Sequence, residues 1–317
     1  MSRLFFCMFL FFALNICSAA DKGSDAAVVD DRIWLDNGVV KIAMSRDYGG
    51  AIVWVSASDS QENMINNADK GRQLQQSYYA GKSLDRTKEG QSPSWSRWSW
   101  NPVQAGNFKG DKSVVLDFEI INDGKTLYSK TQPRLWDMDG ELAKCYMYQW
   151  VEIEDGHDNV IHVKNKLECF RDKQDIWGGP KALSQELPAV YAIRNMSKMV
   201  IYDGKEPWQN KPLTLVKYTD KDNWIWTKQN PTEPWAACLY PETNFGLGVY
   251  SPSANQTWNM GWVGEKGTEF SGATMHFAPI GKWQLSHNTI KEFEYWIIVG
   301  KIGDIRSEVY RLHSVNK

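Results

Sequence analysis

An excess of positive charge is the first thing this 317-residue chain lacks. Lysine and arginine together number 36, against 38 aspartates and glutamates, so the formal net charge is -2. A chain without a basic excess cannot neutralise a nucleic-acid backbone, which excludes a general nucleic-acid-binding function. Charged residues make up 23% and aromatic residues 13% of the sequence, a composition typical of a folded protein.

Cysteine is also scarce. Of five cysteines, Cys7 and Cys17 lie in an N-terminal apolar segment, which leaves Cys145, Cys169 and Cys238. Three cysteines are too few for a disulfide framework, and their number is odd. One disulfide pair or buried free thiols stay open. Cys-x-x-Cys and His-Glu-x-x-His spacings are absent, so we expect no zinc site. The sequence also lacks Gly-x-Ser-x-Gly and the glycine-rich nucleotide loops.

Long apolar runs are absent after residue 20. Before it, Arg3 precedes the apolar residues 4–14, and the small residues Ser18 and Ala20 follow at the -3 and -1 positions of a cleavage site. This pattern is typical of a secretory signal peptide, over residues 1–20, with a membrane anchor as the alternative. Lipidation at Cys17 is disfavoured by the preceding Ile16. We therefore expect a secreted or periplasmic monomer without a membrane span, with residues 21–30 as a flexible N-terminus.

Short β-prone segments fill the rest of the chain. Several alternate apolar and polar residues, as half-buried strands do, and Gly, Asn and Asp separate them at turns such as residues 36–38 and 122–124. The clearest lie at residues 39–44, 51–55, 114–121, 146–153, 160–165 and 291–299. The pattern predicts one all-β domain over residues 31–317, built as a large two-sheet β-sandwich.

Two stretches depart from the strand pattern. Residues 305–313 carry a charged face beside Val309 and Leu312, which predicts the one clear helix. Residues 66–107 are polar and aromatic with little alternation, so we expect long loops that cover one sheet. Long ordered loops on a β scaffold often carry function.

Short motifs near the start and the end of the mature chain resemble the galactose mutarotase-like supersandwich superfamily. Residues 48–55 hold a glycine turn and a strand, residues 62–67 an Asn-rich turn, and Gly71-Arg72 follows. Residues 277–280 and 290–296 are similar to the final strands of that fold. The resemblance implies the supersandwich fold, a sugar ligand and Arg72 beside it. The superfamily includes epimerases, polysaccharide lyase domains, glycoside hydrolases and domains without known catalysis, so the reaction stays open.

One segment departs from the epimerases of this superfamily. They use a histidine in a His-x-Tyr-type segment midway along the chain, where this sequence has Ser-Gln-Glu-Leu-Pro-Ala-Val-Tyr at residues 184–191. No histidine is present there, which argues against a plain mutarotase mechanism.

Tryptophan is abundant, with 16 residues, and it suits sugar recognition because indole rings stack on pyranose faces while amides and charged groups meet the hydroxyls. The segments 71–79, 95–107 and 255–262 combine these residue types. The predicted substrate-binding residues are Arg72, Gln75, Tyr79, Trp98, Trp100, Asn101, Gln104, Gln185 and Trp258. The alternatives are that the tryptophans fill the core, as we expect for Trp34, Trp54, Trp150 and Trp296, and that Arg72 holds a loop.

Glu186 is the first candidate for acid–base chemistry because its neighbours in the sequence are apolar. Asp69 is the candidate second carboxylate, and an elimination could use Tyr78 or Tyr79 with His162 and Arg72. The alternatives are that Glu186 pairs with an arginine and that His162 is structural. Asp137 and Asp139 fit a turn better than a calcium loop, so no cofactor is expected and only a structural Ca²⁺ stays open.

The sequence therefore predicts a carbohydrate-active enzyme that cleaves glycosidic bonds in a poly- or oligosaccharide, by hydrolysis in preference to elimination. The alternatives are a non-catalytic glycan-binding protein and a sugar epimerase.

Overall fold

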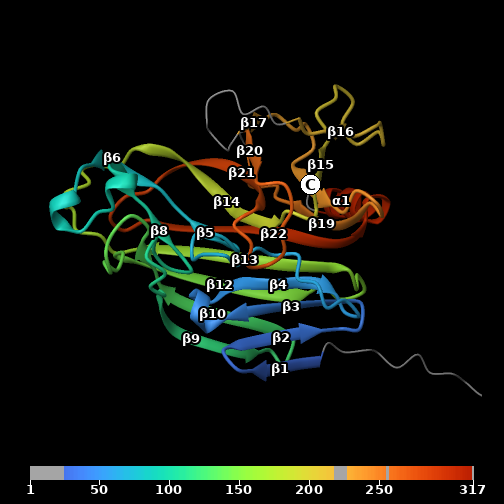
Figure 1. Ribbon diagram of the computed structural model, residues 1–317, viewed down its shortest axis with the longest axis horizontal. Helices are drawn as coiled ribbons and strands as arrows, with labels where there is room; N and C mark the ends of the chain where they lie inside the picture. Colours follow the sequence, from blue (N-terminus) through green and yellow to red (C-terminus); the bar gives the residue numbers. More distant parts are fainter. Residues whose placement is uncertain (1–24, 218–226, 255–256, 316–317) are drawn as a thin grey trace, which may run out of the picture.

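The computed structural model describes residues 25–217, 227–254 and 257–315, so the expected signal segment lies outside the described residues. Within this part of the chain, two large antiparallel sheets pack face to face, which confirms the predicted all-β sandwich (Figure 1). The first sheet has 11 strands, and its main path follows the order β1 (Asp25–Val29), β2 (Arg32–Asp36), β3 (Val40–Ser45), β4 (Ala51–Ala57), β5 (Leu74–Ser77), β14 (Ala182–Ile193), β21 (Thr274–Gln284), β20 (Trp258–Val263) and β17 (Thr227–Gln229). Two short strands extend it beside β5, namely β8 (Pro102–Val103) and β11 (Arg134–Leu135).

The second sheet has nine strands among the described residues. Their order is β16 (Thr214–Leu215), β15 (Lys198–Ile201), β18 (Trp235–Leu239), β19 (Phe245–Tyr250), β22 (Ile290–Lys301), β13 (Val160–Cys169), β12 (Cys145–Ile153), β10 (Thr126–Gln132) and β9 (Val114–Ile121). A separate hairpin-like pair joins β6 (Ala80–Leu84) to β7 (Trp98–Trp100).

The alternation of side chains along β12 shows how the sequence forms these sheets. Cys145, Met147 and Val151 are fully buried between the sheets, whereas Tyr148 and Trp150 lie on the outer face. Successive side chains of a strand point to opposite faces, so a two-residue period fixes which face enters the core. Trp34, Trp54 and Trp150 were expected in the core, and the structure corrects this: all three are half-buried.

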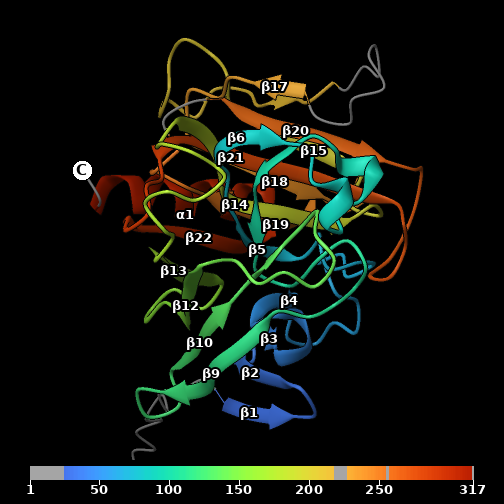
Figure 2. The same ribbon diagram turned by 90° about the vertical axis from the view of Figure 1, so that its left-hand side faces the viewer.

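The helix α1 (Ile302–Val315) covers one end of the second sheet (Figures 1 and 2). Ile305, Val309 and Leu312 recur at helical spacing and pack with residues of β18, β19 and β22 in a second apolar cluster. Gly248 of β19 lies directly beneath Ile305, where a Cβ atom would collide with the isoleucine side chain. The helix predicted at residues 305–313 is confirmed and is longer at both ends.

Two expectations about the N-terminal half are corrected. Asp25–Val29 forms β1 and pairs with β2, so residues 25–29 are not part of a flexible terminus. The stretch of residues 66–107 is more than loops, because β5 lies inside the first sheet between β4 and β14. The central residues of β5, Gln75 and Gln76, are polar but fully buried. A buried polar strand does not show an alternating apolar pattern in the sequence.

The three cysteines of the described chain are free and buried. Cys145 and Cys169 are register partners on β12 and β13, and Cys238 lies on β18. Of the two possibilities that the sequence left open, the structure shows buried thiols. In the same part of the chain, no helix has the length and apolarity needed to cross a membrane.

Candidate functional site

A cluster of titratable side chains lies on the outer face of the first sheet, where β5, β14 and β21 run side by side. Glu186 and Tyr191 come from β14, His276 from β21, and Tyr79 from the segment directly after β5. The Glu186 Oε1 and His276 Nε2 atoms are 3.3 Å apart, and the rings of Tyr191 and His276 are 4.3 Å apart between centroids. These residues form the Glu186 cluster.

A β-bulge on β14 creates this arrangement. The pairing register with β21 shifts between Glu186 and Val190, and the register with β5 shifts between Glu186 and Ala189. Strict alternation would place Glu186 and Tyr191 on opposite faces, since they are an odd number of residues apart. The irregular register returns Val190 to the core and directs Tyr191 outward to His276, which is how bulges re-aim side chains near active sites.

Solvent reaches the members of the cluster unequally. His276 is fully buried, while the Glu186 side chain is 14% exposed and the two tyrosines are half-buried. Burial, with a further contribution from the Glu186 charge, raises the pKa of Tyr79 and Tyr191 above the ordinary value. Both phenols are therefore neutral hydrogen-bond donors across the physiological range, and Glu186 is the carboxyl group that faces solvent, with His276 beneath it.

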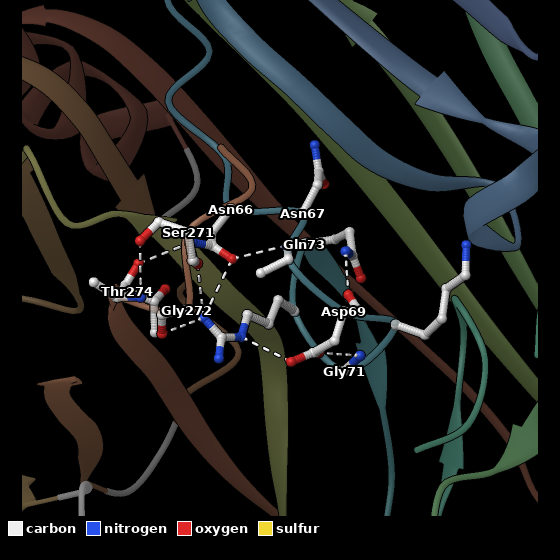
Figure 3. Close-up of polar contacts among 12 residues, drawn as sticks. Asn66, Asn67, Asp69, Gly71, Gln73, Ser271, Gly272 and Thr274 are labelled. Atoms are coloured by element: carbon white, nitrogen blue, oxygen red, sulfur yellow. Dashed lines mark hydrogen bonds and ion pairs between the residues drawn. The ribbon is translucent and has the colours of Figure 1, made fainter. Parts of the chain in front are cut away.

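A clamped loop lies next to the cluster. Arg72 contacts the Asp69 carboxylate through Nε at 3.0 Å and donates through Nη1 to the carbonyl oxygens of Gly272 at 2.8 Å and Ser271 at 3.3 Å. Figure 3 shows these contacts, together with Asn66, whose amide donates to the Ser271 carbonyl at 2.9 Å. Arg72 therefore holds two loops together, as in the alternative considered above. The charges of Asp69 and Arg72 also act on Tyr191, so this loop borders the cluster.

Three tryptophans form a wall beside Tyr79. The Trp98 ring meets Tyr79 edge-on at 6.3 Å between centroids, Trp95 meets Trp98 at 5.1 Å, and Trp95 meets Trp136 at 5.6 Å. Trp136 in turn lies against Gly71, where a Cβ atom would collide with its ring. All three are half-buried, so the wall connects Tyr79 with the Arg72 loop and offers aromatic surface at the edge of the cluster.

The structure thus brings together several residues that the sequence predicted for one site. They are Glu186, Tyr79, Arg72, Asp69 and Trp98. Gln185 supports them from below: its amide donates to the Tyr79 carbonyl at 2.9 Å and accepts from the Tyr79 N–H at 2.7 Å. Because Gln185 is fully buried, it positions Tyr79 and does not face a ligand.

Other predicted aromatic residues are corrected to core positions. Tyr78, Trp100 and Trp258 are at most 2% exposed and belong to the main apolar cluster. The Tyr78 hydroxyl donates to Gln76 at 2.8 Å, and burial raises its pKa well above the ordinary value. A ring enclosed in the core cannot stack on a sugar or exchange a proton with it.

The predicted amides Gln75, Asn101 and Gln104 are also buried, at most 1% exposed. Their side chains bond to backbone groups: Gln75 accepts from the Ala105 N–H, Asn101 donates to the Tyr78 carbonyl, and Gln104 accepts from the Gln76 N–H. Buried polar groups need such partners, so these amides hold the loops that cover the sheet.

His162 is corrected to a different part of the molecule. It lies on β13 of the second sheet, where Nδ1 is 3.3 Å from Glu152 and Nε2 is 3.0 Å from Glu294. Since Glu186 lies on the first sheet, His162 cannot act with it.

His276 and Tyr191 are the functional candidates that sequence reasoning missed. His276 alternates with the core residues Met275 and Phe277, which places it on the outer face of β21. That alternation was visible in the sequence, but its pairing with Glu186 depends on the neighbouring strand. Tyr191 was hidden by the bulge.

The Asp137–Asp139 segment forms a turn, as expected. Asp139 contacts Lys109 at 2.6 Å, and Asp137 accepts from Gln91 at 2.6 Å. Burial raises the pKa of Asp137. Within residues 25–217, 227–254 and 257–315, no group of three or more His, Cys, Asp or Glu residues has a metal-binding arrangement.

No protein-family model matches the chain, and no curated protein matches it. Similar solved structures include a galactose mutarotase-related enzyme from Lactobacillus acidophilus, with 10% identity, a TM-score of 0.49, and coverage of 84% of this chain and 97% of that one. A putative aldose 1-epimerase from Escherichia coli K12 has 8% identity, a TM-score of 0.49, and coverage of 87% and 99%. A heparan sulfate lyase from Pedobacter heparinus has 10% identity, a TM-score of 0.41, and coverage of 88% and 36%.

Identities of 8–10% and TM-scores below 0.5 assign this chain neither a family nor a reaction. The chemistry of this chain is therefore argued from its own residues.

Proposed function

We propose that this chain is a carbohydrate-active enzyme that cleaves glycosidic bonds in an oligo- or polysaccharide, with the Glu186 cluster as its active site. The observation that carries the proposal is the contact of a partly exposed carboxylate, Glu186, with the buried His276, beside two tyrosines with raised pKa values. Such groupings are characteristic of sites that transfer protons. A secreted or periplasmic setting belongs to the same proposal and follows from the N-terminal sequence.

The surroundings of the cluster favour a sugar as the substrate. The tryptophan wall of Trp95, Trp98 and Trp136 offers ring surface for the apolar face of a pyranose. The phenols of Tyr79 and Tyr191 and the Arg72 guanidinium are donors that suit hydroxyl or carboxylate oxygens. Aromatic surface with a few placed polar groups is the usual make-up of a small-molecule site.

Hydrolysis is the reaction that we favour, with Glu186 and Asp69 as its carboxylates. Glycosidases use two carboxyl groups roughly 5–9.5 Å apart on either side of the scissile bond. The charges of both Glu186 and Asp69 raise the pKa of Tyr191, so both carboxylates act on the same phenol. In this arrangement Glu186 gives a proton to the glycosidic oxygen as its bond to the anomeric carbon breaks, and water adds to that carbon and loses a proton to Asp69. His276 positions Glu186, and the tyrosines bind hydroxyl groups.

Elimination from a uronic acid is the second candidate, and one observation favours it. Asp69 already accepts hydrogen bonds from Arg72 and from the Gly71 N–H, whereas the groups nearest Glu186 are a histidine and tyrosines. A lyase needs a base for the proton next to the carboxyl group and a cation or donors that neutralise this carboxyl group. Glu186 would be the base, and the Arg72 charge together with the neutral Tyr191 phenol would face the carboxyl group.

The test is a screen of the purified protein against neutral and uronic-acid polysaccharides, run beside Glu186→Gln. We expect new reducing ends with the wild type and a loss of at least about a hundredfold in rate with the variant, the usual scale for a proton-transfer group. Ultraviolet absorbance of an unsaturated uronate would identify elimination, and its absence would identify hydrolysis.

The matched control is Glu242→Gln, a change at an exposed glutamate in the turn between β18 and β19. It should keep the wild-type rate. If Glu186→Gln cleaves as fast as Glu242→Gln, the Glu186 cluster is not the active site.

A further inference from the structure

A pocket of about 450 Å³ opens on the outer face of the second sheet, on the side of the sandwich away from Glu186. It is lined by side chains of β10, β12, β13 and β22, among them Trp150, His162, Lys164 and Glu292. Its volume lies within the range of small-molecule sites, roughly 300–1,000 Å³. The Glu186 cluster contributes no residue to its lining, so the function proposed above does not account for it.

Trp150 lines the pocket, and it belongs to a row of aromatic rings that continues beside the pocket on the same face of the sheet. The Trp150 ring lies 5.3 Å from Tyr128 on β10 and 6.0 Å from Tyr148 on β12, between centroids, and it is parallel to Tyr148 within 5°. Lys130 and Lys166 flank Tyr148 from the neighbouring strands, with Nζ 5.4 Å and 4.7 Å from the ring centroid. These contacts hold the row of rings in place before any ligand binds, which lowers the entropic cost of binding.

Trp150 also keeps a polar group available. Its indole N–H makes no hydrogen bond to any residue of the described chain and is not buried. A half-buried indole with a free N–H can pack its ring against an apolar surface and donate to an oxygen at the edge of that surface. A pyranose presents this combination, since its C–H face is bordered by hydroxyl groups.

Fixed polar groups of both signs complete the lining. His162 is held between Glu152 and Glu294, at 3.3 Å and 3.0 Å, and stacks on Trp296 with ring centroids 4.9 Å apart. Burial alone would lower the pKa of His162, but the hydrogen bonds to the two glutamates outweigh it, and the pKa is raised.

Charged side chains of both signs face the pocket. Lys164, Lys166 and His162 line it together with Glu152 and Glu292, and Glu294 also contacts His162. An anionic ligand would meet the two carboxylates, and a cationic ligand would meet the two ammonium groups. An apolar peptide would desolvate all four without replacing their hydrogen bonds. A neutral ligand rich in hydroxyl groups can accept from the lysines and donate to the glutamates.

We infer that this pocket is a second carbohydrate site, which binds a neutral sugar unit stacked on Trp150. The pocket holds a glycan chain on the face of the molecule opposite to the Glu186 cluster.

The inference is tested by titrating neutral and uronic-acid oligosaccharides into the full chain by calorimetry, with Glu186→Gln present throughout so that nothing is cleaved. Trp150→Ala should raise the dissociation constant for a neutral oligosaccharide at least about tenfold, the effect of truncating a central aromatic contact. Trp150→Phe keeps a ring and should lose less. The matched control is Trp54→Ala, a half-buried tryptophan on the outer face of β4, which should bind as before.

The outcomes separate this site from the Glu186 cluster. Two binding events, of which Trp150→Ala removes one, support both sites. A single event that Trp150→Ala removes supports this pocket and counts against sugar binding at Glu186. The inference is overturned if no neutral oligosaccharide binds, if only anionic ones bind, or if Trp150→Ala and Trp54→Ala bind alike.

Discussion

Histidine serves two different purposes in this protein, and the difference comes from its neighbours. His276 is enclosed beneath the single carboxylate of Glu186 and against the Tyr191 ring, where it holds a group that faces solvent. His162 lies between two carboxylates and on the face of Trp296, so its own charge is what the site stabilises. The imidazole of His276 thus positions Glu186 on the first sheet, whereas the imidazole of His162 forms ion pairs with Glu152 and Glu294 on the second sheet.

The raised pKa of His162 gives a pH-dependent contribution to stability. Its folded-state pKa lies above the ordinary value of 6.5, so the protonated form stabilises the fold below that pH, and the contribution is lost as the pH rises through the folded-state pKa. His162→Gln should therefore lower the Tm more at about pH 5.5 than at about pH 9. Thermal unfolding followed across this range by circular dichroism measures the difference.

His287→Gln is the control, since the histidine ion pairs in the described part of the chain involve His157, His162 and His276 and not His287. It should show no comparable trend with pH. An equal loss of Tm at both pH values for His162→Gln would mean that packing on Trp296, and not charge, is what His162 contributes.

At the scale of elements, a buried carboxylate ties α1 to the second sheet. Glu233 is fully buried and accepts hydrogen bonds from the Trp235 indole at 2.7 Å, the Trp208 N–H at 2.7 Å and the Tyr310 hydroxyl at 2.8 Å. Arg306 of α1 lies 3.7 Å from it. One side chain therefore joins the segment before β18, the loop after β15 and the C-terminal helix.

Removal of this carboxylate should cost far more than removal of an exposed one. We expect Glu233→Ala to lower the free energy of unfolding by about 3–5 kcal/mol, because it leaves a buried arginine and several donors without their acceptor. The control is Glu206→Ala, whose side chain is 66% exposed and pairs with Lys211. That change should cost less than about 1 kcal/mol. Urea unfolding measures both, and similar losses would contradict this account of how α1 is held.

At the scale of the whole molecule, the sandwich separates two polar surfaces by an apolar core. The Glu186 cluster lies on the outer face of the first sheet, and the Trp150 pocket lies on the outer face of the second. Between them, Cys145, Cys169 and Cys238 are enclosed with the core side chains of both sheets. The thiols therefore report on the integrity of the sandwich as a unit.

These thiols should not react with an aqueous disulfide reagent while the protein is folded. Burial raises the pKa of Cys169 to about 12 and that of Cys145 and Cys238 well above the ordinary value, so almost no thiolate exists at neutral pH. We expect no modification of the three core thiols in native buffer and modification of all three in denaturant, with the transition at the urea midpoint of global unfolding. Native reactivity of any of them would show a local opening of the sheets.

Much of the fold could be predicted from the sequence, and the reason is local. Alternation along residues 146–153 and 160–165 reports which face of each strand enters the core, and helical spacing marks α1. Buried polar strands gave no such signal, so β5 was taken for loop. The strand pattern around Trp150 does not show how much of the outer face other elements cover. Its half-buried position on that face was therefore not predicted.

The sequence by itself determined the all-β class, the strand periodicity and the identity of Glu186, Tyr79 and the Arg72 loop as candidates, because these follow from residue types and short-range pattern. Only the tertiary structure decided which candidates meet. It placed His276 against Glu186 through the pairing of β14 with β21, and it separated His162 onto the other sheet. The bulge turned Tyr191 outward. The physical reason is that strand pairing joins residues far apart in the chain, and one irregular position reverses the face of every residue after it.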